Sequence, residues 1–531
     1  MIKMKYIDKS PTAKADCTIT CNDKKSFINL EELNNENTEV TQYATLEPNR
    51  FILNGNFQLY PVPFPTGQVY ISETMSNENG DYITPIVITR TFTQKHTSSG
   101  VSFVFDNNDD KCWCTKVNIK WYRDSTILYD ITYYPNDSIY FCPQNVVAFN
   151  KMVFTFYSTN KPYRYLRIFN IEDGIDREFG EDEINGLRII EEISESSEAL
   201  SINTAEIDMK SKTDLDFIFQ RTQGIYIYND DNLICKVFNS ESTKEIEHKY
   251  NIYAEDYIGI LDKEQFLGGI YNNYSLKAIL DEICGDIPHD YTGTETITGY
   301  LPVMTKRQAL QYIAFATCKV VDCSRSECIK IKTLSNTPKT IDISRVMKGQ
   351  KQSVGAIVTQ VVIAEHMLKE NTTTSELVSE VVNGTYTFVF NKPYHSYSIT
   401  GGTLVDSGAN YATITGTGSE VILTGKGYDD VTKQLMVDNP VAVATDLPNV
   451  VEKLKNTLIT SSNSANVLKH IAEIFFRNKT LTTTVLLGDE VVGDMVIIPT
   501  EMGTVTGRII GIELDLVNGL AELTILEVEN E

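Results

Sequence analysis

Residues 510–525 read IGIELDLVNGLAELTI and carry the clearest structural pattern in the chain. From Ile510 to Leu516 every second residue is Ile or Leu, and the alternation resumes at Ala521, Leu523 and Ile525. A period of two is typical of a strand with one buried face. Asn518-Gly519 lies between the two runs and tolerates the positive φ angles of a tight hairpin turn, which fixes the strand register. The stretch therefore predicts an antiparallel hairpin.

Three helices are expected upstream of this hairpin. Residues 462–478 place Val467, Leu468, Ile471, Ile474 and Phe475 on one face, with Asn463 or Ser464 as the cap. Thr305 followed by Gln308 forms a capping box, which starts a second helix. Ser275 and Gly285 bound a third helix over Leu276–Cys284.

The N-terminal part is expected to be all-β. Val117, Ile119 and Trp121 alternate with polar residues, and turn signals recur at short spacing between 41 and 165, which favours a β-sandwich. Residues 1–40 are polar, and we expect an arm that is ordered only by contact with partners, with a loop at Asn34–Asn37. We also expect a turn over Asn107–Asp110 and a strand at Asp216–Phe219.

Composition excludes some classes of function. The 531 residues predict about three to five domains. The formal net charge of −24 disfavours sequence-independent binding to nucleic acid or to an anionic membrane. No signal peptide and no stretch of about 18 apolar residues is visible, so we expect synthesis in the cytosol and no membrane anchor.

One segment is unusually acidic. Between Ile171 and Leu200 there are eleven Asp or Glu residues and two Arg. A solvated face or loop is the preferred interpretation, and a charged ring on an assembled oligomer is the alternative.

No catalytic or metal-binding motif is recognisable. The six His are dispersed, and the Cys pairs 17/21, 112/114 and 323/328 lack the spacing of paired Cys-x-x-Cys clusters. With 71 Asp and Glu, carboxylate pairs can be drawn anywhere, so composition does not identify a glycosidase. We predict no catalytic residue, no metal and no cofactor.

Trp113, Trp121 and Tyr122 are the candidate carbohydrate contacts, because aromatic rings stack on sugars. Core packing of the sandwich is the preferred alternative, since Trp121 alternates with polar neighbours.

Three segments resemble a known family. They are residues 253–271 (YAEDYIGILD through FLGGIY), residues 299–326 (GYLP, TKRQALQYIAFA and SRS) and residues 493–521 (GDMV through GRII to LVNGLA). Together they resemble phage tail proteins of Gram-positive bacteria, which are related to the baseplate hub of contractile phages. The likeness covers roughly residues 166–531, and residues 41–165 resemble a galactose-binding β-sandwich more weakly.

The resemblance implies a mainly β fold with α+β parts. The implied domains are an N-terminal arm (1–40), a β-sandwich (41–165), a first hub β-barrel (166–262), an α/β domain (263–345), a β-rich outer domain (346–450), and a helix with the second hub β-barrel (451–531).

The implied function is structural. Three subunits would form a ring that joins the tail tube to the spike or tip, and DNA would pass through its channel without specific binding. The subunit would be assembled in the host cytoplasm and reside in the virion, with other baseplate proteins as partners. A host-wall carbohydrate-binding role of the β-sandwich in adsorption is the alternative. The chain has no fibre or wall-hydrolase extension after the last barrel, so we predict that it is not an enzyme.

Overall fold

The structure is a computed structural model in which two compact units are distinguished. The small unit comprises Lys5–Glu178 and Thr213–Ile225, and the large unit comprises Met1–Met4, Phe179–Lys212 and Tyr226–Glu531. The structure describes residues 1–9, 11–26, 28–30, 33, 43–45, 47–48, 50, 59–60, 70–107, 111–212, 215, 219–221, 223–245, 248–443 and 450–528. The predicted loop at 34–37, most of the turn at 107–110 and the strand at 216–218 lie outside these residues.

The small unit consists of strands around one large core. Its strands are β2 (Cys17–Cys21), β3 (Tyr43–Ala44), β4 (Leu59–Tyr60), β5 (Tyr70–Met75), β6 (Asp81–Phe105), β7 (Cys114–Arg123), β8 (Thr126–Tyr133), β9 (Ile139–Thr159) and β10 (Tyr165–Phe179). Within the described residues these strands pair antiparallel: β7 lies between β8 and β9, and β6 pairs with β2, β9 and β10.

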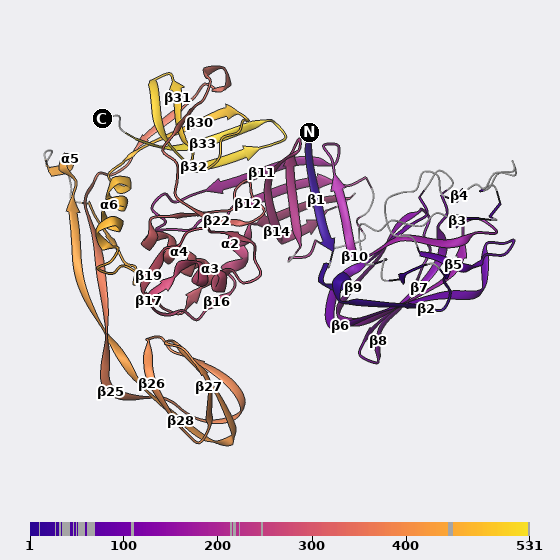
Figure 1. The fold of residues 1–531 in the computed structure, drawn as a ribbon. Coiled ribbons are helices and arrows are strands. Elements are labelled where there is room, and N and C mark those ends of the chain that lie inside the picture. The colour runs from indigo at the N-terminus through magenta and orange to yellow at the C-terminus, as the bar shows by residue number, and fades with distance from the viewer. Residues whose placement is uncertain are drawn as a thin grey trace. The chain divides into compact units, whose positions relative to one another are not determined.

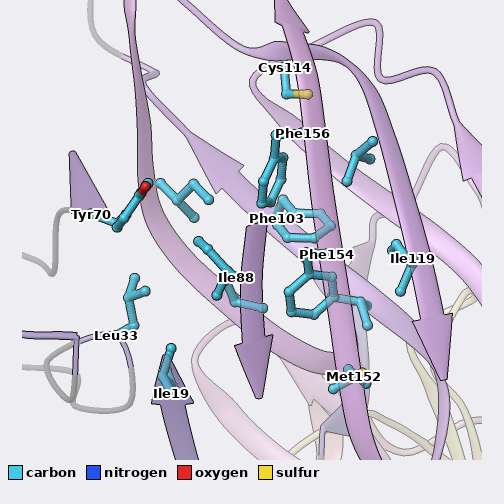
Figure 2. Close-up of a cluster of buried hydrophobic side chains, with 14 of the residues drawn as sticks. Ile19, Leu33, Tyr70, Ile88, Phe103, Cys114, Ile119, Met152, Phe154 and Phe156 are labelled. Carbon is cyan, nitrogen blue, oxygen red and sulfur yellow. The ribbon is translucent and has the colours of Figure 1, made fainter. Parts of the chain in front are cut away.

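Alternation along these strands explains the core of the small unit. Phe103, Phe154 and Phe156 are fully buried and meet edge to face or tilted, at centroid distances of 5.3–6.4 Å. Figure 2 shows these rings with Ile88 and Ile119 among the strands. Because every second side chain points inward, the intervening residues form a solvent-facing layer.

The predicted N-terminal arm contains regular structure. β1 (Ile2–Lys9) alternates buried and half-buried residues, and Met4 and Tyr6 have no exposed surface. The short helix α1 (Pro11–Asp16) follows, and β2 pairs with β6 from Cys17↔Phe92 to Cys21↔Ile88. We expected this segment to be ordered only by contact with partners. Instead, β1 and β2 are regular strands within the chain itself.

The large unit is organised on one continuous antiparallel run of strands. The run comprises, in order, β14 (Asn232–Lys244), β15 (Lys249–Glu255), β12 (Thr204–Lys210), β11 (Ile184–Glu192), β32 (Gly503–Asp515), β33 (Leu520–Glu527), β30 (Lys479–Leu486) and β24 (Lys351–Val354). The mainly β fold predicted from the sequence is confirmed.

A strand pairing, which we call the seam, joins the two regions that the family resemblance implies are the two hub barrels. β11 pairs with β32 from Arg188↔Asp515 to Glu192↔Gly511. The backbone N–H of Leu516 also donates to the carbonyl of Leu187 at 3.1 Å. The N-terminal and C-terminal strand groups of the large unit therefore share one sheet (Figure 1).

One stretch of chain, residues 338–354, pairs with the strands at both ends of the C-terminal strand group. β31 (Met495–Thr500) pairs with β32 and, in parallel, with β23 (Pro338–Thr340). After the 3-10 turn η2 (Ile343–Arg345), Val346 bridges to Val485 on β30. The stretch from β23 to β24 thus connects both ends of the run β31–β32–β33–β30, which hides strand edges.

The predicted hairpin is present with two local differences. β32 and β33 pair as expected, but a register shift between Ile509 and Gly511 makes Ile509 fully buried and Ile510 only half-buried. The turn is a four-residue loop, residues 516–519, in which only Gly519 takes a positive φ, of 68°. A bulge inserts one residue and changes which side chains face inward, and strict alternation cannot reveal this.

A small α/β part follows the first strand group. It contains α2 (Tyr257–Leu261), β16 (Gln265–Phe266), β17 (Gly269–Ser275), α3 (Leu276–Cys284), β18 (His289–Asp290), β19 (Thr296–Leu301), β20 (Met304–Thr305), α4 (Lys306–Thr317), β21 (Val320–Asp322) and β22 (Ile329–Lys332). Both predicted caps are confirmed: the Ser275 hydroxyl accepts from the N–H of Ala278, and Thr305 with Gln308 forms the capping box.

Residues 346–450 consist chiefly of a long ribbon (Figure 1). β25 (Val358–Val389) and β28 (Tyr411–Asp438) pair antiparallel along their length, with β26 (Tyr394–Thr400) and β27 (Thr403–Ser407) added near the tip. α5 (Pro440–Val443), β29 (Val450–Leu454) and α6 (Ser464–Phe475) follow. α6 is shorter than the helix predicted over 462–478. The remaining strand, β13, spans Gly224–Asn229.

Candidate functional site

The candidate site is the solvent-facing side of the sheet across the β11–β32 seam. Along β12, the buried residues Ala205, Ile207 and Met209 alternate with solvent-facing polar residues. The solvent-facing side holds a groove of about 580 Å³. We call this surface the acidic face, and its charged groove-lining residues are Arg188, Glu206, Asp208, Glu241, Glu513 and Asp515.

One arginine organises the centre of the acidic face. Arg188 donates from Nε and Nη2 to the two carboxylate oxygens of Glu513, at 2.5 and 2.8 Å. Its Nη1 lies 3.5 Å from Glu206 Oε2. The Arg188 hydrogen bond lowers the pKa of Glu513, so this carboxylate stays ionised at neutral pH. With five acidic residues and one arginine in the groove, the face carries a negative charge.

A buried network lies where the α/β part meets the sheet. Glu191 on β11 has no exposed surface, and its Oε1 accepts from Arg325 Nη1 at 2.5 Å. Arg325 Nη1 also donates to the carbonyl of Ile234. Burial raises the pKa of Glu191 to about 7, against the opposing effect of Arg325. Arg325 therefore ties its loop to two strands of the sheet.

Two further buried carboxylates belong to this network. Asp256 caps α2 by accepting from the N–H groups of Ile258 and Gly259, and burial raises its pKa to about 7. Asp322 accepts from Lys332 Nζ at 2.7 Å. The hydrogen bonds account for the position of each carboxylate, so the network has a structural explanation.

The acidic segment 171–200 is only in part the solvated face or loop that we preferred, since six of its eleven carboxylate side chains are exposed. It forms the end of β10 and all of β11, and Glu172, Asp173, Glu183, Glu191 and Glu195 are buried. Arg90 holds Asp173 through two hydrogen bonds of 2.8 and 2.9 Å. Buried charges require such partners, and sequence spacing does not reveal partners more than 80 residues away.

The structure does not bring the three candidate carbohydrate contacts together. Trp121 is fully buried in the core, with Tyr133 in a T-shaped arrangement at 6.5 Å, so it cannot stack on a sugar. Trp113 is partly buried against the same core. Tyr122 lies on the opposite, half-exposed side of β7. Trp113 and Trp121 are also eight residues apart, or roughly 26 Å along an extended chain.

Three histidines have carboxylate partners that the sequence could not identify. His96 lies 2.9 Å from Asp16, His289 lies 2.8 Å from Asp281, and His366 lies 2.8 Å from Asp430. Among the residues described, no hydroxyl or thiol is hydrogen-bonded to the second ring nitrogen of these three, where a catalytic nucleophile would lie.

The ten cysteines are all free, and the described residues hold no group of three or more His, Cys, Asp or Glu that could bind a metal ion. Within the same residues, no helix has the length and apolar character needed to cross a membrane.

No family model matches the chain, and no curated protein matches it. Several solved structures match the chain. A prophage tail protein from Listeria monocytogenes is 10% identical, with 68% of this chain and 93% of that chain covered and a TM-score of 0.41. A tail protein from Neisseria meningitidis is 9% identical, with 67% and 94% covered and a TM-score of 0.41. A type VI secretion system component of E. coli, described as similar to bacteriophage tail proteins, is 7% identical, with 66% and 74% covered and a TM-score of 0.34.

Proposed function

We propose that this chain is a structural subunit of a phage or phage-like tail tip or baseplate. Three copies form a ring that connects the tail tube to the spike or tip, and the acidic face lines the channel for DNA. The subunit assembles in the host cytoplasm, resides in the virion and contacts other baseplate proteins. It acts without catalysis.

The observation that carries the proposal is the seam between β11 and β32. It places two groups of strands side by side in one subunit with a common polar face. Three such subunits would present six strand groups, which suits a sixfold tube above and a threefold spike below. The resemblance of residues 166–531 to tail proteins supports the same arrangement.

The acidic face suits a channel for DNA. Its carboxylates repel phosphates, so DNA would pass without adhering. The opposite face of the strands is apolar, with Ile189, Ile207, Leu514 and Leu523 buried, so only the polar face is available to a water-filled lumen.

The test is the oligomeric state of the full chain. Mass photometry, alone and with tail-tube and spike proteins from the same particle, is expected to show a trimer, and class averages in electron microscopy are expected to show a closed ring. A chain that stays monomeric in the presence of these partners contradicts the proposal.

A further inference from the structure

The outward side of β7 and β9 in the small unit has a composition unlike the rest of this acidic chain. On β7, Val117, Ile119 and Trp121 point into the core and are fully buried. The alternate residues therefore point outward. We call this surface the lysine–tyrosine face, and it consists of Lys116, Lys120, Tyr122, Lys151 and Tyr157.

Cation–π contacts organise the lysine–tyrosine face. Lys151 Nζ lies 5.0 Å from the centroid of the Tyr122 ring, its cross-strand neighbour. Lys116 Nζ lies 5.0 Å from the centroid of the Tyr157 ring. These contacts hold the ammonium groups at the sheet surface, where they remain half-exposed or exposed.

The charge of this face is positive. Lys120 lies 3.1 Å from Asp130, whereas Lys116 and Lys151 form no ion pair with the described residues. Lys116 and Lys120 are four residues apart on one strand, about 13 Å, and Lys151 extends the row to roughly 20 Å. The positive charges therefore form a line, which suits an extended ligand better than a small ion.

We infer that the lysine–tyrosine face binds an acidic polysaccharide. Widely spaced negative charges on such a polymer match a row of lysines, and half-exposed tyrosine rings offer apolar faces and hydroxyl groups to sugar units. Thr132 and Thr155 lie on the same side and add further hydroxyl groups. This role goes beyond a ring-forming function and does not depend on it.

The geometry favours a polysaccharide over nucleic acid or an acidic protein. Duplex DNA carries one charge per roughly 1.7 Å, so three lysines neutralise few of its phosphates, while the chain's net charge of −24 repels it. An acidic protein surface is bound best by arginine forks, and the face as defined contains only lysine.

The experiment measures binding of the full chain to four immobilised polymers by biolayer interferometry: a polyuronate, neutral dextran, duplex DNA and polyglutamate. The test variant is Lys116→Gln with Lys120→Gln and Lys151→Gln. The matched control is Lys369→Gln with Lys426→Gln and Lys433→Gln, which removes the same charge from the ribbon. Circular dichroism and the melting temperature verify that both variants are folded.

We expect the polyuronate to bind wild type and control alike, and the test variant to bind at least tenfold more weakly. Added salt is expected to weaken wild-type binding. Equal polyuronate binding by the test variant overturns the inference, as does stronger binding to dextran, DNA or polyglutamate. A chain that stays monomeric in the presence of its tail partners but still binds polyuronate would contradict the ring and leave this inference standing.

Discussion

The burial of Glu191 could not be predicted from the sequence. Glu191 lies in a strand and is followed by Glu192, yet it has no exposed surface, whereas Glu192 faces solvent. Its Oε2 has no hydrogen-bond partner in the structure. A buried carboxylate with one unsatisfied oxygen favours the protonated form, which is why its pKa rises.

This environment predicts a pH dependence of stability. The ordinary pKa of 4.5 applies to the unfolded chain, and the folded value is about 7, so the folded state holds the proton more tightly. The stabilisation is complete below pH 4.5 and is lost as the pH rises to about 7, on the order of 3 kcal/mol in all. Asp256, with a pKa also raised to about 7, adds a change of the same sign.

Calorimetric melting temperatures between pH 5 and pH 8 check this prediction. The transition of the large unit is expected to move to lower temperature as the pH rises, and Glu191→Gln is expected to reduce that slope because it cannot ionise. An unchanged slope in this variant would show that Glu191 does not titrate in the folded chain. Glu513→Gln, at an exposed position, serves as the control.

At the scale of the element, the hairpin β32–β33 shows what turn chemistry contributes. The loop is held by Asp515, whose carboxylate accepts from the backbone N–H and the side-chain amide of Asn518, at 3.1 and 2.6 Å. Gly519 has a φ of 68°, in the left-handed region. An added Cβ at this position would meet no atom within 4 Å. The cost of a side chain here therefore comes from the left-handed backbone conformation and not from a steric clash.

Gly519→Ala is therefore expected to destabilise the large unit by about 1 kcal/mol. Urea unfolding of the full chain, monitored by hydrogen exchange in residues 503–527, measures the effect. Gly511→Ala is the control, because an added Cβ would make ordinary contact with Thr524 at 3.5 Å and Gly511 is not among the residues with positive φ. Equal losses in both variants would mean that φ at 519 is not the cause.

At the scale of the whole molecule, charge and sheet geometry act together. The whole chain has a net charge of −24, and the groove across the seam of the large unit is acidic, whereas the lysine–tyrosine face of the small unit is basic. If the acidic face lines a DNA channel, its charge acts on the passing DNA and not on the contacts between subunits. Mutations of the acidic face should therefore change DNA binding without changing assembly.

A charge-reversal variant tests this separation. If the proposed ring forms, Glu206→Lys with Asp208→Lys and Glu513→Lys is expected to leave its trimeric state unchanged and to give it measurable affinity for short duplex DNA, whereas the wild-type chain is expected to show none. The control reverses Glu376, Glu380 and Asp429 on the ribbon by the same charge. If fluorescence anisotropy shows equal DNA binding by both variants, the acidic face does not line the channel.

Prediction from the sequence was correct for features that depend on residues close together in the chain. The capping box at Thr305 depends on residues three apart, and alternation in 510–525 depends on neighbours, so both could be read directly. It failed for Ile510 because a bulge shifts the register, whereas the preferred interpretation of Trp121 as a core residue was correct. The candidate site itself could not be predicted, since Arg188 and Glu513 are 325 residues apart.

The sequence by itself determined the mainly β fold, the caps of α3 and α4, the hairpin and the negative charge, because propensity, periodicity and composition act within a few residues or on the whole chain at once. Only the tertiary structure decided that β11 pairs with β32, which carboxylates are buried beside arginine, and which polar residues share one face. These features depend on backbone hydrogen bonds and ion pairs between segments far apart in the chain, and their energies appear only when folding brings the segments together.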